Sequence, residues 1–531
     1  MIQKIKYIIL SLGFVMLMQS CEKNLDLKPE DDRLTADVAF ETPGAYRAFL
    51  AKLYAGISLS GQEGPAGNPD LSGLDEGFSN YLRLYWKMQE LTTDEAVIAW
   101  NDGTIKNLHA QNWTSGNEFI RTMYSRIMYQ ISLTNEFLRQ TTDSKLSDRG
   151  VDATLKAEIQ KYRAEARFMR ALSYWHAMDL FGNPPFVTDN DPIGAFLPEQ
   201  INRSDLFDYI ESELLDIESK IVPARQNEYG RADQAAVWML LAKLYLNSEV
   251  YTNTSRYNDV ITYTTKIINA GYTIPANPYY QSFLADNDSN GAQDEVIFTI
   301  PFDGLHTQSY GGMTFLVHAA VGGDMNPADF GINGGWYGLR TTSALVDLFP
   351  TPESSPDGRA LFFTTNQTKE IADISVFKNG YAIQKFKNVD VNGNPGSDPE
   401  NFPDTDFPMF RLADAYLMYA EANLRGGGGD TATAVGYINQ LRQRAYGDAS
   451  GNISTSDLTL DFILNERARE LYWEAHRRTD LIRFGKFSDQ GVWPWKGNVP
   501  QGTTTEAFRN VMPIPASDLG VNTNLIQNPG Y

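Results

Sequence analysis

The longest uninterrupted helical pattern of the chain lies at residues 156–181. Apolar side chains recur there every three or four residues, which places them on one face of a helix. Gly182 stands where helices commonly end, and Pro184 and Pro185 prevent continuation. This pattern predicts a buried helix that ends abruptly. The apolar face consists of Ile159, Tyr162, Ala166, Met169, Leu172, Trp175 and Met178.

Helical spacing recurs along much of the remaining chain. Ser204 is a suitable N-cap for one of these segments, because its hydroxyl can accept a hydrogen bond from the first helical turn. The pattern therefore predicts a mostly α fold. Helices are expected at residues 43–57, 120–139, 204–221, 233–248, 256–270, 412–424, 431–446 and 461–484.

Several of these helices come in pairs. Residues 233–248 precede 256–270, and residues 412–424 precede 431–446. Two helices in a unit of roughly 34 residues are typical of tetratricopeptide repeats, although coincidental helical hairpins are the alternative. We expect the helix pairs to occupy roughly residues 120–272 and 408–485.

Two long parts of the chain lack helical spacing. Residues 58–118 and 273–406 are rich in glycine, proline, asparagine and scattered acids, so they are expected to form loops and short strands. Loops of this length in a helical body usually bind something. We expect the functional site there.

The N-terminus has the features of an export signal. Lys4 and Lys6 precede an apolar run, residues 7–18, which is too short to span a bilayer. The run leads to Cys21, the sole cysteine, in a context similar to a bacterial lipobox. An ordinary signal with a chance cysteine is the alternative. We predict a signal peptide at 1–20, a lipidated tether at 21–33 and a body at 34–531.

The charge of the chain restricts its partners. The formal net charge is −21, which repels phosphates, so nucleic acid is not an expected partner. A neutral ligand is the simpler expectation.

Hydrolysis by two carboxylates is the enzymatic alternative, but 66 acidic residues make candidate pairs abundant. Glu466, Glu470 and Glu474 share one predicted helical face, where they are expected to form structural ion pairs with nearby arginines. The five histidines are dispersed without metal-ligand spacing, and His176 is expected to be a core residue. A binding protein is therefore favoured. The arginines are Arg467, Arg469, Arg477 and Arg478.

One segment is similar to the start of a calcium loop. Asp286, Asp288 and Asn290 place oxygen ligands at alternate positions before Gly291, but the twelfth position is Ile297, which cannot ligate. A polar turn without metal is favoured over a structural calcium site. No cofactor is expected to be required.

Three parts of the chain together resemble the SusD/RagB family of Bacteroidetes surface lipoproteins. Their order and their positions match the family from Cys21 to the C-terminus. They are EARFMRA (165–171) with LFGNPP (180–185), NERAREL (465–471) with RRTDLIRFG (477–485), and PIP (513–515) with QNPGY (527–531).

This resemblance implies a single, mostly α body with tetratricopeptide-like helix pairs and a loop-rich glycan-binding half that contains short strands. It also implies a partner, a TonB-dependent outer-membrane transporter of the SusC type. The chain would be anchored to the outer membrane by lipid and would face the cell exterior, as the acidic residues after Cys21 also suggest.

Within the family the chain is most similar to the starch-binding branch, judged from DEG (75–77), DEAVIAWN (94–101) and GGWYGLRTT (334–342). The resemblance implies that α-glucan, such as a maltooligosaccharide, binds to an arc of aromatic residues with polar side chains beside it. Another glycan, or a peptide as in some RagB relatives, is the alternative ligand. The implied arc is Trp100, Trp336 and Tyr310, and the implied polar contacts are Asp75, Arg83 and Asn101.

The chemistry of a neutral sugar suits these residue types. Sugar rings present C–H faces that stack on aromatic side chains, while their hydroxyls exchange hydrogen bonds with carboxylate, amide and guanidinium groups. A curved α-glucan needs a curved platform. Trp100 and Trp336 both adjoin turn-forming residues, which distinguishes them from tryptophans expected in the core, such as Trp175.

Overall fold

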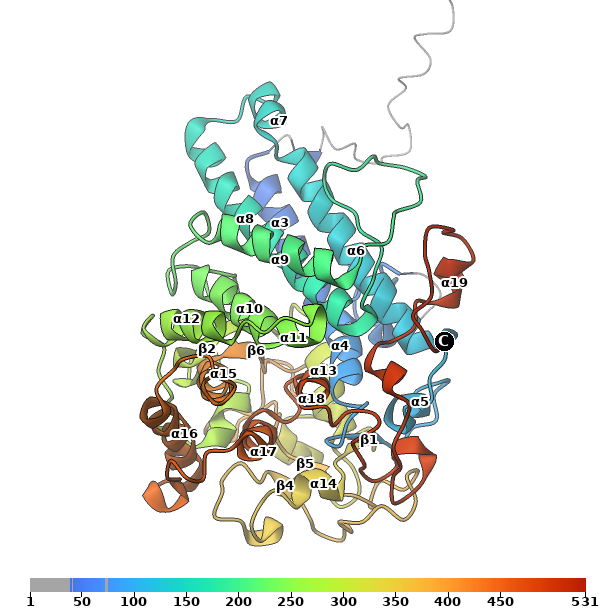
Figure 1. Ribbon diagram of the computed structural model, residues 1–531. Coiled ribbons are helices and arrows are strands. Elements are labelled where there is room, and N and C mark those ends of the chain that lie inside the picture. Colours follow the sequence, from blue (N-terminus) through green and yellow to red (C-terminus); the bar gives the residue numbers. More distant parts are fainter. Residues whose placement is uncertain (1–38, 41, 72–74) are drawn as a thin grey trace, which may run out of the picture.

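The predicted long helix is confirmed. The computed structural model describes residues 39–40, 42–71 and 75–531, and in it α8 (Ala153–Phe181) runs through the upper part of the molecule (Figure 1). Asp152 caps its first turn by accepting hydrogen bonds from the N–H groups of Thr154 and Leu155. Gly182, with φ of 69°, ends it. The predicted signal peptide, tether and Cys21 lie outside the described residues.

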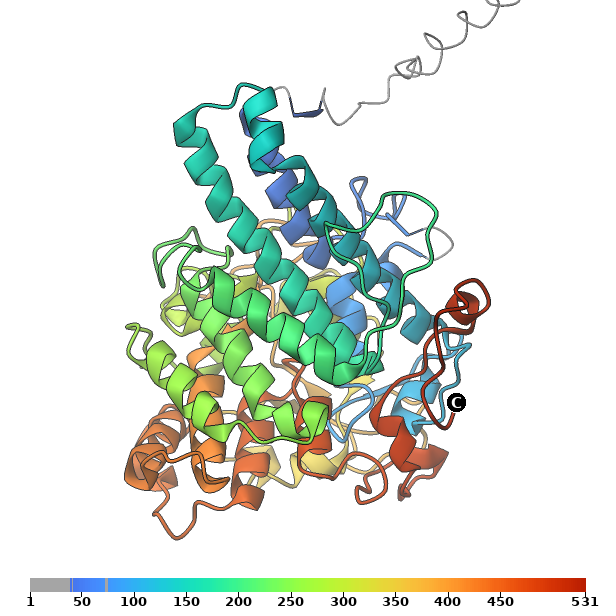
Figure 2. The same ribbon diagram turned by 45° about the horizontal axis from the view of Figure 1, so that its top comes forward.

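Long helices surround α8. Helices α3 (Gly44–Ser58) and α6 (Glu118–Gln140) lie beside it at the top of the molecule (Figure 2). Helix α9 (Arg203–Ile217) also packs against α8. The remaining helices of this half are α7 (Asp143–Asp148), α10 (Gln234–Leu246), α11 (Ser248–Thr252) and α12 (Tyr257–Ile268).

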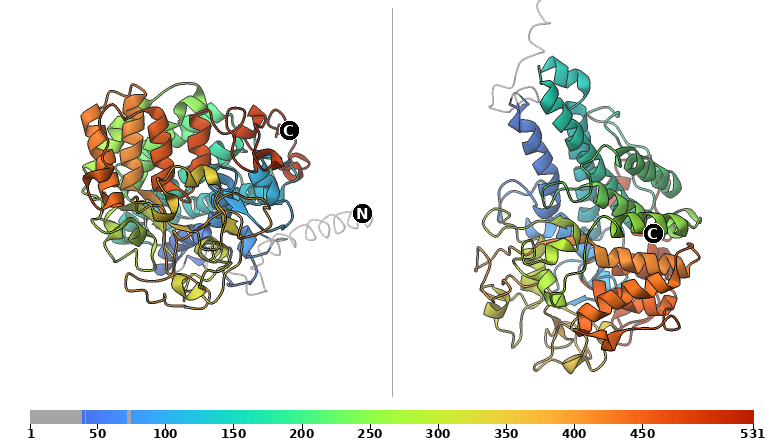
Figure 3. Two further views of the ribbon diagram at one scale, coloured as in Figure 1. Left: turned by 90° about the horizontal axis from the view of Figure 1, so that it is seen from below. Right: turned by 90° about the vertical axis from the view of Figure 1, so that its left-hand side faces the viewer.

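The predicted helix pairs pack together. Helix α10 lies against α12, and α15 (Leu412–Leu424) lies against both α16 (Thr431–Tyr446) and α12. Helix α17 (Leu460–Leu471) packs on α15. Figure 3 shows these C-terminal helices along one side of the molecule and the loop-rich segments beside them. The mostly α fold class is therefore confirmed.

The loop-rich segments contain short helices. Helix α4 (Tyr81–Gln89) is fully buried and contacts α6, α13 (Gly312–Ala319) and α18 (Arg477–Arg483), so it belongs to the core although it follows a glycine-rich loop. The loop-rich segments also contain α5 (Lys106–Ala110) and α14 (Ser343–Val346), and α19 (Ala516–Leu519) lies near the C-terminus.

Within the described residues, three antiparallel two-stranded sheets join separate parts of the chain. Strand β1 (Val97–Ile98) pairs with β3 (Leu339–Arg340), and β4 (Phe362–Phe363) pairs with β5 (Ala382–Ile383). The longer pair is β2 (Val296–Ile300) with β6 (Phe407–Arg411), whose register shifts twice. These pairs confirm the expected short strands.

Two details of the helix prediction were wrong. Residues 461–484 form α17 and α18 rather than one helix, because Trp473 and Ala475 between them take positive φ angles of 64°. Helix α9 starts one residue before Ser204, and the side chain of Asn202 caps it instead. Trp473 is nevertheless buried, as are Trp175 and His176, whose Nδ1 lies 2.8 Å from the hydroxyl of Tyr81.

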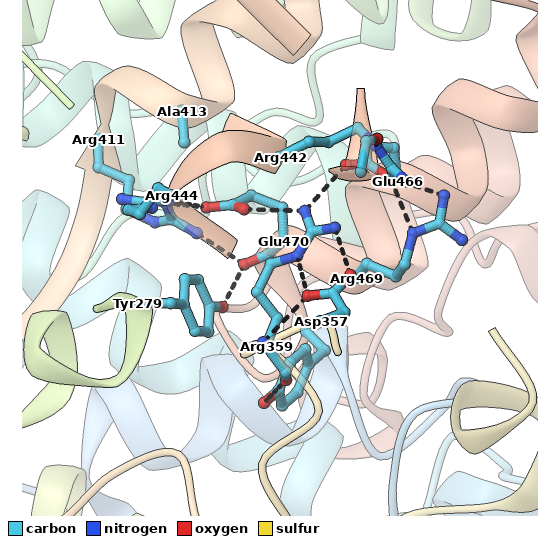
Figure 4. Close-up of polar contacts among 12 residues, drawn as sticks. Tyr279, Asp357, Arg359, Arg411, Ala413, Arg442, Arg444, Glu466, Arg469 and Glu470 are labelled. Carbon is cyan, nitrogen blue, oxygen red and sulfur yellow. Dashed lines mark hydrogen bonds and ion pairs between the residues drawn. The ribbon is translucent and has the colours of Figure 1, made fainter. Parts of the chain in front are cut away.

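A buried ion network joins α17 to the loop-rich half (Figure 4). Arg359 Nη1 lies 2.9 Å from Glu466 and 3.1 Å from Glu470, and Arg411 Nη1 lies 2.7 Å from Glu470. Glu474 pairs with Arg411 at 2.6 Å. These side chains are at most 2% exposed.

In this network the attraction between carboxylates and guanidinium groups outweighs the loss of hydration that burial imposes on the charges. Burial alone would raise the pKa of Glu466, but Arg359, Arg469 and Arg442 lower it to about 2. The pKa of Glu470 is likewise held well below its ordinary value, against burial, by neighbouring arginines. Both carboxylates are therefore ionised at neutral pH and fully engaged in structure.

The expected ion pairing is confirmed for these glutamates, but most of the expected partners were wrong. Of the four arginines, only Arg469 pairs with one of them, Glu466, at 2.6 Å. The break between α17 and α18 turns Arg477 and Arg478 elsewhere, and Arg467, which directly follows Glu466 in α17, lies on a different face of that helix. Arg467 pairs with Asp414 and Asp480, Arg477 with Asp94, and Arg478 with Asp179.

Among the described residues, no helix is both long and apolar enough to cross a membrane.

Replacing Glu470 tests the network. We expect Glu470→Ala to lower the free energy of unfolding by about 3–5 kcal/mol, because it leaves buried guanidinium groups unpaired. Denaturant unfolding measures the change. The matched control is Asp461→Ala, which removes an exposed partner of Lys486 and should leave the unfolding midpoint unchanged. Equal effects of the two substitutions would contradict a structural role for the network.

Candidate functional site

The β1–β3 ladder places two distant loops side by side. Val97 lies opposite Arg340 and Ile98 opposite Leu339, and the N–H of Ala99 donates to the carbonyl of Gly338 at 2.9 Å. The chain beyond the ladder therefore carries Trp100 to the segment that contains Trp336. The indole Nε1 of Trp100 donates to the carbonyl of Trp336 at 2.8 Å.

The segment that carries Trp336 is fixed on the end of α13. The N–H groups of Trp336, Tyr337 and Gly338 donate to the carbonyls of three residues at that end: His318, Val321 and Ala319, at 2.8, 3.0 and 2.9 Å. The imidazole of His318 stacks on the Trp336 ring, with centroids 4.8 Å apart and planes 28° apart. Trp336 therefore has little freedom to move.

The three predicted aromatic residues come together. The ring centroids of Trp100 and Trp336 are 6.3 Å apart at an angle of 44°, and those of Tyr310 and Trp336 are 6.4 Å apart at 51°. All three side chains are partly exposed. Because the planes are tilted rather than parallel, the rings form an arc and not a flat row.

Tyr310 is held by a buried carboxylate. Glu76, 4% exposed, accepts a hydrogen bond from the Tyr310 N–H at 3.0 Å and another from the Ser309 hydroxyl at 2.6 Å. Phe402 packs behind the Tyr310 ring, with centroids 5.5 Å apart. Both oxygens of Glu76 are occupied in positioning this loop.

The predicted polar residues differ in exposure. Asp75 and Asn101 are exposed, and one oxygen of Asp75 accepts a hydrogen bond from the Phe78 N–H at 3.3 Å. Arg83 is only 3% exposed, and its Nη1 donates to the carbonyl of Tyr310 at 3.0 Å. Asp75 and Asn101 can meet a ligand directly, whereas Arg83 supports the arc from beneath.

Arg83 remains a cation in this position. Its guanidinium lies 4.4 Å from the ring centroid of Phe315 and 4.6 Å from that of Phe78. Burial lowers its pKa to about 9, although Asp75, Asp102 and Glu76 oppose the shift. At neutral pH its charge therefore faces aromatic rings next to the arc.

Residue 338 is a glycine because its backbone lies in close contact with the Trp100 ring. A Cβ atom at this residue would lie 2.7 Å from Cε2 and Cζ2 of Trp100, which no side chain can accommodate without moving the indole. The ring of Trp100 thus rests directly on the backbone of the residue that precedes β3. Of the three glycines in GGWYGLRTT, this packing explains Gly338.

The candidate calcium loop is stabilised by its own hydrogen bonds. Asp286 Oδ1 accepts from the Asn290 amide at 3.0 Å, its Oδ2 accepts from the Val391 N–H at 3.2 Å, and Asp288 accepts from the Ser289 hydroxyl at 2.8 Å. In the described part of the chain, no cluster of three or more His, Cys, Asp or Glu side chains could hold a metal ion. Calcium binding at Asp286, Asp288 and Asn290 stays a prediction.

Sequence reasoning missed three supporting residues. Glu76, His318 and Phe402 fix the arc but do not belong to it. Glu76 lies within the DEG motif (75–77), which is a signal in the sequence. His318 and Phe402 carry no comparable signal, because only folding brings them to the rings.

The packing of Trp100 gives a direct prediction. We expect Gly338→Ala to displace the indole, since its Cβ would overlap the ring. Fluorine NMR of 5-fluorotryptophan-labelled protein, with the Trp100 resonance assigned through Trp100→Phe, should show that resonance shifted. Gly334→Ala is the control, because a Cβ there meets nothing within 4 Å. An unmoved Trp100 resonance in Gly338→Ala would contradict the packing.

Comparison with known proteins identifies similar chains. A family model described as "SusD family" matches residues 362–531. The chain is 36% identical to the starch-binding protein SusD of Bacteroides thetaiotaomicron, over 96% of each chain. It is 26% identical to SusD-like protein P25 of Formosa agariphila, over 72% of this chain and 75% of that one.

Solved structures confirm the expected fold. A SusD superfamily protein from Bacteroides thetaiotaomicron has a TM-score of 0.69 at 21% identity, covering 92% of this chain and all of that one. Surface glycan-binding protein A from the same organism, in complex with laminarihexaose, has a TM-score of 0.67 at 18% identity, covering 91% and 98%. The similarity at this identity concerns the fold alone.

Proposed function

The chain belongs to the SusD family, and from this premise we propose that it captures a starch-like α-glucan without cleaving it. The observation that carries this proposal is the tilted arc of Trp100, Trp336 and Tyr310. Its rings are partly exposed and held from behind, as a platform for a curved, neutral chain requires.

Hydrogen-bonding groups complete the proposed site. Asn101 follows Trp100, and Asp75 precedes Glu76, which positions Tyr310; both side chains are exposed and can exchange hydrogen bonds with sugar hydroxyls. Arg83 contributes its charge and the support of the Tyr310 backbone. The platform therefore offers stacking and directional contacts without needing a charged ligand or a cofactor.

Starch-like glucan is the preferred ligand because a relative with 36% identity over nearly the whole chain is named a starch-binding protein. Another glycan is the second candidate, since a structurally similar protein was solved with laminarihexaose. A peptide is disfavoured, because the proposed platform consists of aromatic rings and small polar groups. The net charge of −21 disfavours nucleic acid.

Binding is favoured over hydrolysis. A glycosidase needs two carboxyl groups free to face the scissile bond. At the arc, both oxygens of Glu76 are engaged by the backbone and hydroxyl of the Tyr310 loop. Glu466 and Glu470 are buried in the ion network. These three carboxylates thus have structural tasks.

We place this activity at the cell surface. Cys21, as the proposed lipid attachment site, would anchor the body in the outer membrane facing the exterior. A TonB-dependent transporter of the SusC type is the proposed partner that receives the captured glycan.

Native gels that contain amylopectin test the ligand. We expect the mature protein to be retarded and Trp100→Ala/Trp336→Ala to migrate as in a gel without polysaccharide, because the stacking platform is lost. Tyr280→Ala, at an exposed tyrosine of the 3-10 helix η2 (Tyr279–Phe283), is the matched control and should be retarded normally. EDTA should leave the retardation of the wild-type protein unchanged, because the proposed site needs no metal ion.

Further lanes separate the alternatives. Gels containing laminarin or other glycans test the second candidate, and product analysis after incubation with maltoheptaose tests hydrolysis. Normal retardation of the double variant would refute the site, and steady release of short sugars would refute the assignment as a binding protein.

Replacement of Cys21 tests the anchor. We expect Cys21→Ser to be exported but released from the membrane fraction, because no acyl chain can be attached to serine at this position. Cell fractionation and labelling with radioactive palmitate measure both effects. Membrane association of the variant equal to that of the wild-type protein would contradict lipid anchoring at Cys21.

A further inference from the structure

Tyr337 is an exposed aromatic residue that directly follows Trp336 of the arc in the chain. The residue is 53% exposed, the highest value for a Phe, Tyr or Trp among the described residues. It follows Trp336 in the chain and precedes Gly338, on whose backbone the Trp100 ring rests. A single exposed aromatic residue needs no explanation by itself, so a binding role for Tyr337 has to be argued from its surroundings.

The backbone of Tyr337 is held in a strained conformation. Its φ angle is 54°, in the left-handed region that bulky residues rarely adopt. The hydrogen bonds from the N–H groups of Trp336, Tyr337 and Gly338 to the end of α13 impose this conformation. Strain that the surroundings maintain in this way is typical of functional sites.

The ring of Tyr337 is held in place by its packing against Phe377 and Gly322. It packs edge-on against Phe377, with centroids 5.7 Å apart, and lies over Gly322, where a Cβ would approach the ring to 2.7 Å. Any side chain larger than glycine at Gly322 would push the ring away. One part of the ring is therefore supported while the rest faces solvent.

Polar side chains lie next to the segment that supports the Tyr337 ring. The stem of Lys378 lies next to Gly323 and Phe377, and its ammonium pairs with Asp324 at 2.6 Å. The amide of Asn366 donates to the other oxygen of Asp324, also at 2.6 Å. This surface is similar in composition to the arc, which has a carboxylate (Asp75), an amide (Asn101) and a guanidinium group (Arg83) beside it.

We infer that Tyr337, with Asp324, Asn366 and Lys378 at its edge, forms a second subsite that binds the continuing sugar units of a long α-glucan. This inference rests on the proposed function and adds a preference for chain length. A short oligosaccharide occupies the arc alone. A longer chain that leaves the arc at Trp336 meets the Tyr337 ring next.

Calorimetric titration with maltotriose and maltoheptaose tests the subsite. We expect Tyr337→Ala to bind maltoheptaose roughly three- to tenfold more weakly than the wild-type protein, the loss expected for one aromatic stacking contact, and to bind maltotriose unchanged. Tyr337→Phe should retain binding of both sugars. Tyr337→Gly removes the ring and also relieves the strain at φ of 54°, so it should show the same loss without lower thermal stability.

Control variants distinguish sugar binding by Tyr337 from a purely supporting role of its ring. Tyr280→Ala removes a half-exposed tyrosine elsewhere and should bind both sugars normally. Unchanged maltoheptaose binding by Tyr337→Ala and Tyr337→Gly would overturn the subsite while the proposed function stands. An equal loss for both sugars would also overturn it, because the ring would then only support Trp336. Absence of binding by the wild-type protein would overturn the proposed function and the subsite together.

Discussion

The buried ion network around Glu470 is the constraint on which the relation between the two halves depends. Arg359 and Arg411 reach it from the loop-rich half and from β6, while Glu466 and Glu470 reach it from α17. Each charge is compensated only when all these segments are in place. Buried pairs add less net stability than their number implies, but breaking one is expensive, so they favour a single arrangement of the segments.

That arrangement explains how loops can present a rigid platform. The aromatic arc depends on the two-residue pairs of β1 and β3, on hydrogen bonds to the end of α13 and on the buried carboxylate of Glu76. None of these contacts is strong alone. Because the helices beneath them are fixed, together they hold the rings in preorganised positions, which reduces the entropy lost when a flexible polysaccharide binds.

The sequence predicted what depends on local pattern. The apolar spacing of α8, α15 and α16 and the glycines beside Trp336 were sufficient to locate helices and candidate loops. The break between α17 and α18 was missed. The positive φ angles of Trp473 and Ala475 are imposed by tertiary contacts, and the spacing of apolar residues does not change at this point of the sequence. The arc itself came from family resemblance, since residues 236 positions apart in the chain carry no mutual signal before folding. The roles of His318 and Tyr337 likewise became visible only from their neighbours in space.

The site is distinct from a hollow of about 280 Å³ beside α3, which is lined in part by Tyr54, Tyr229 and Pro301. The most direct test of the proposed site is a crystal structure of the wild-type protein soaked with maltoheptaose. We predict glucose units stacked on Trp100, Trp336 and Tyr310, with Asp75 or Asn101 within hydrogen-bonding distance of their hydroxyls. Sugar bound in the hollow beside α3, or anywhere else while these three rings remain bare, would contradict the proposed site.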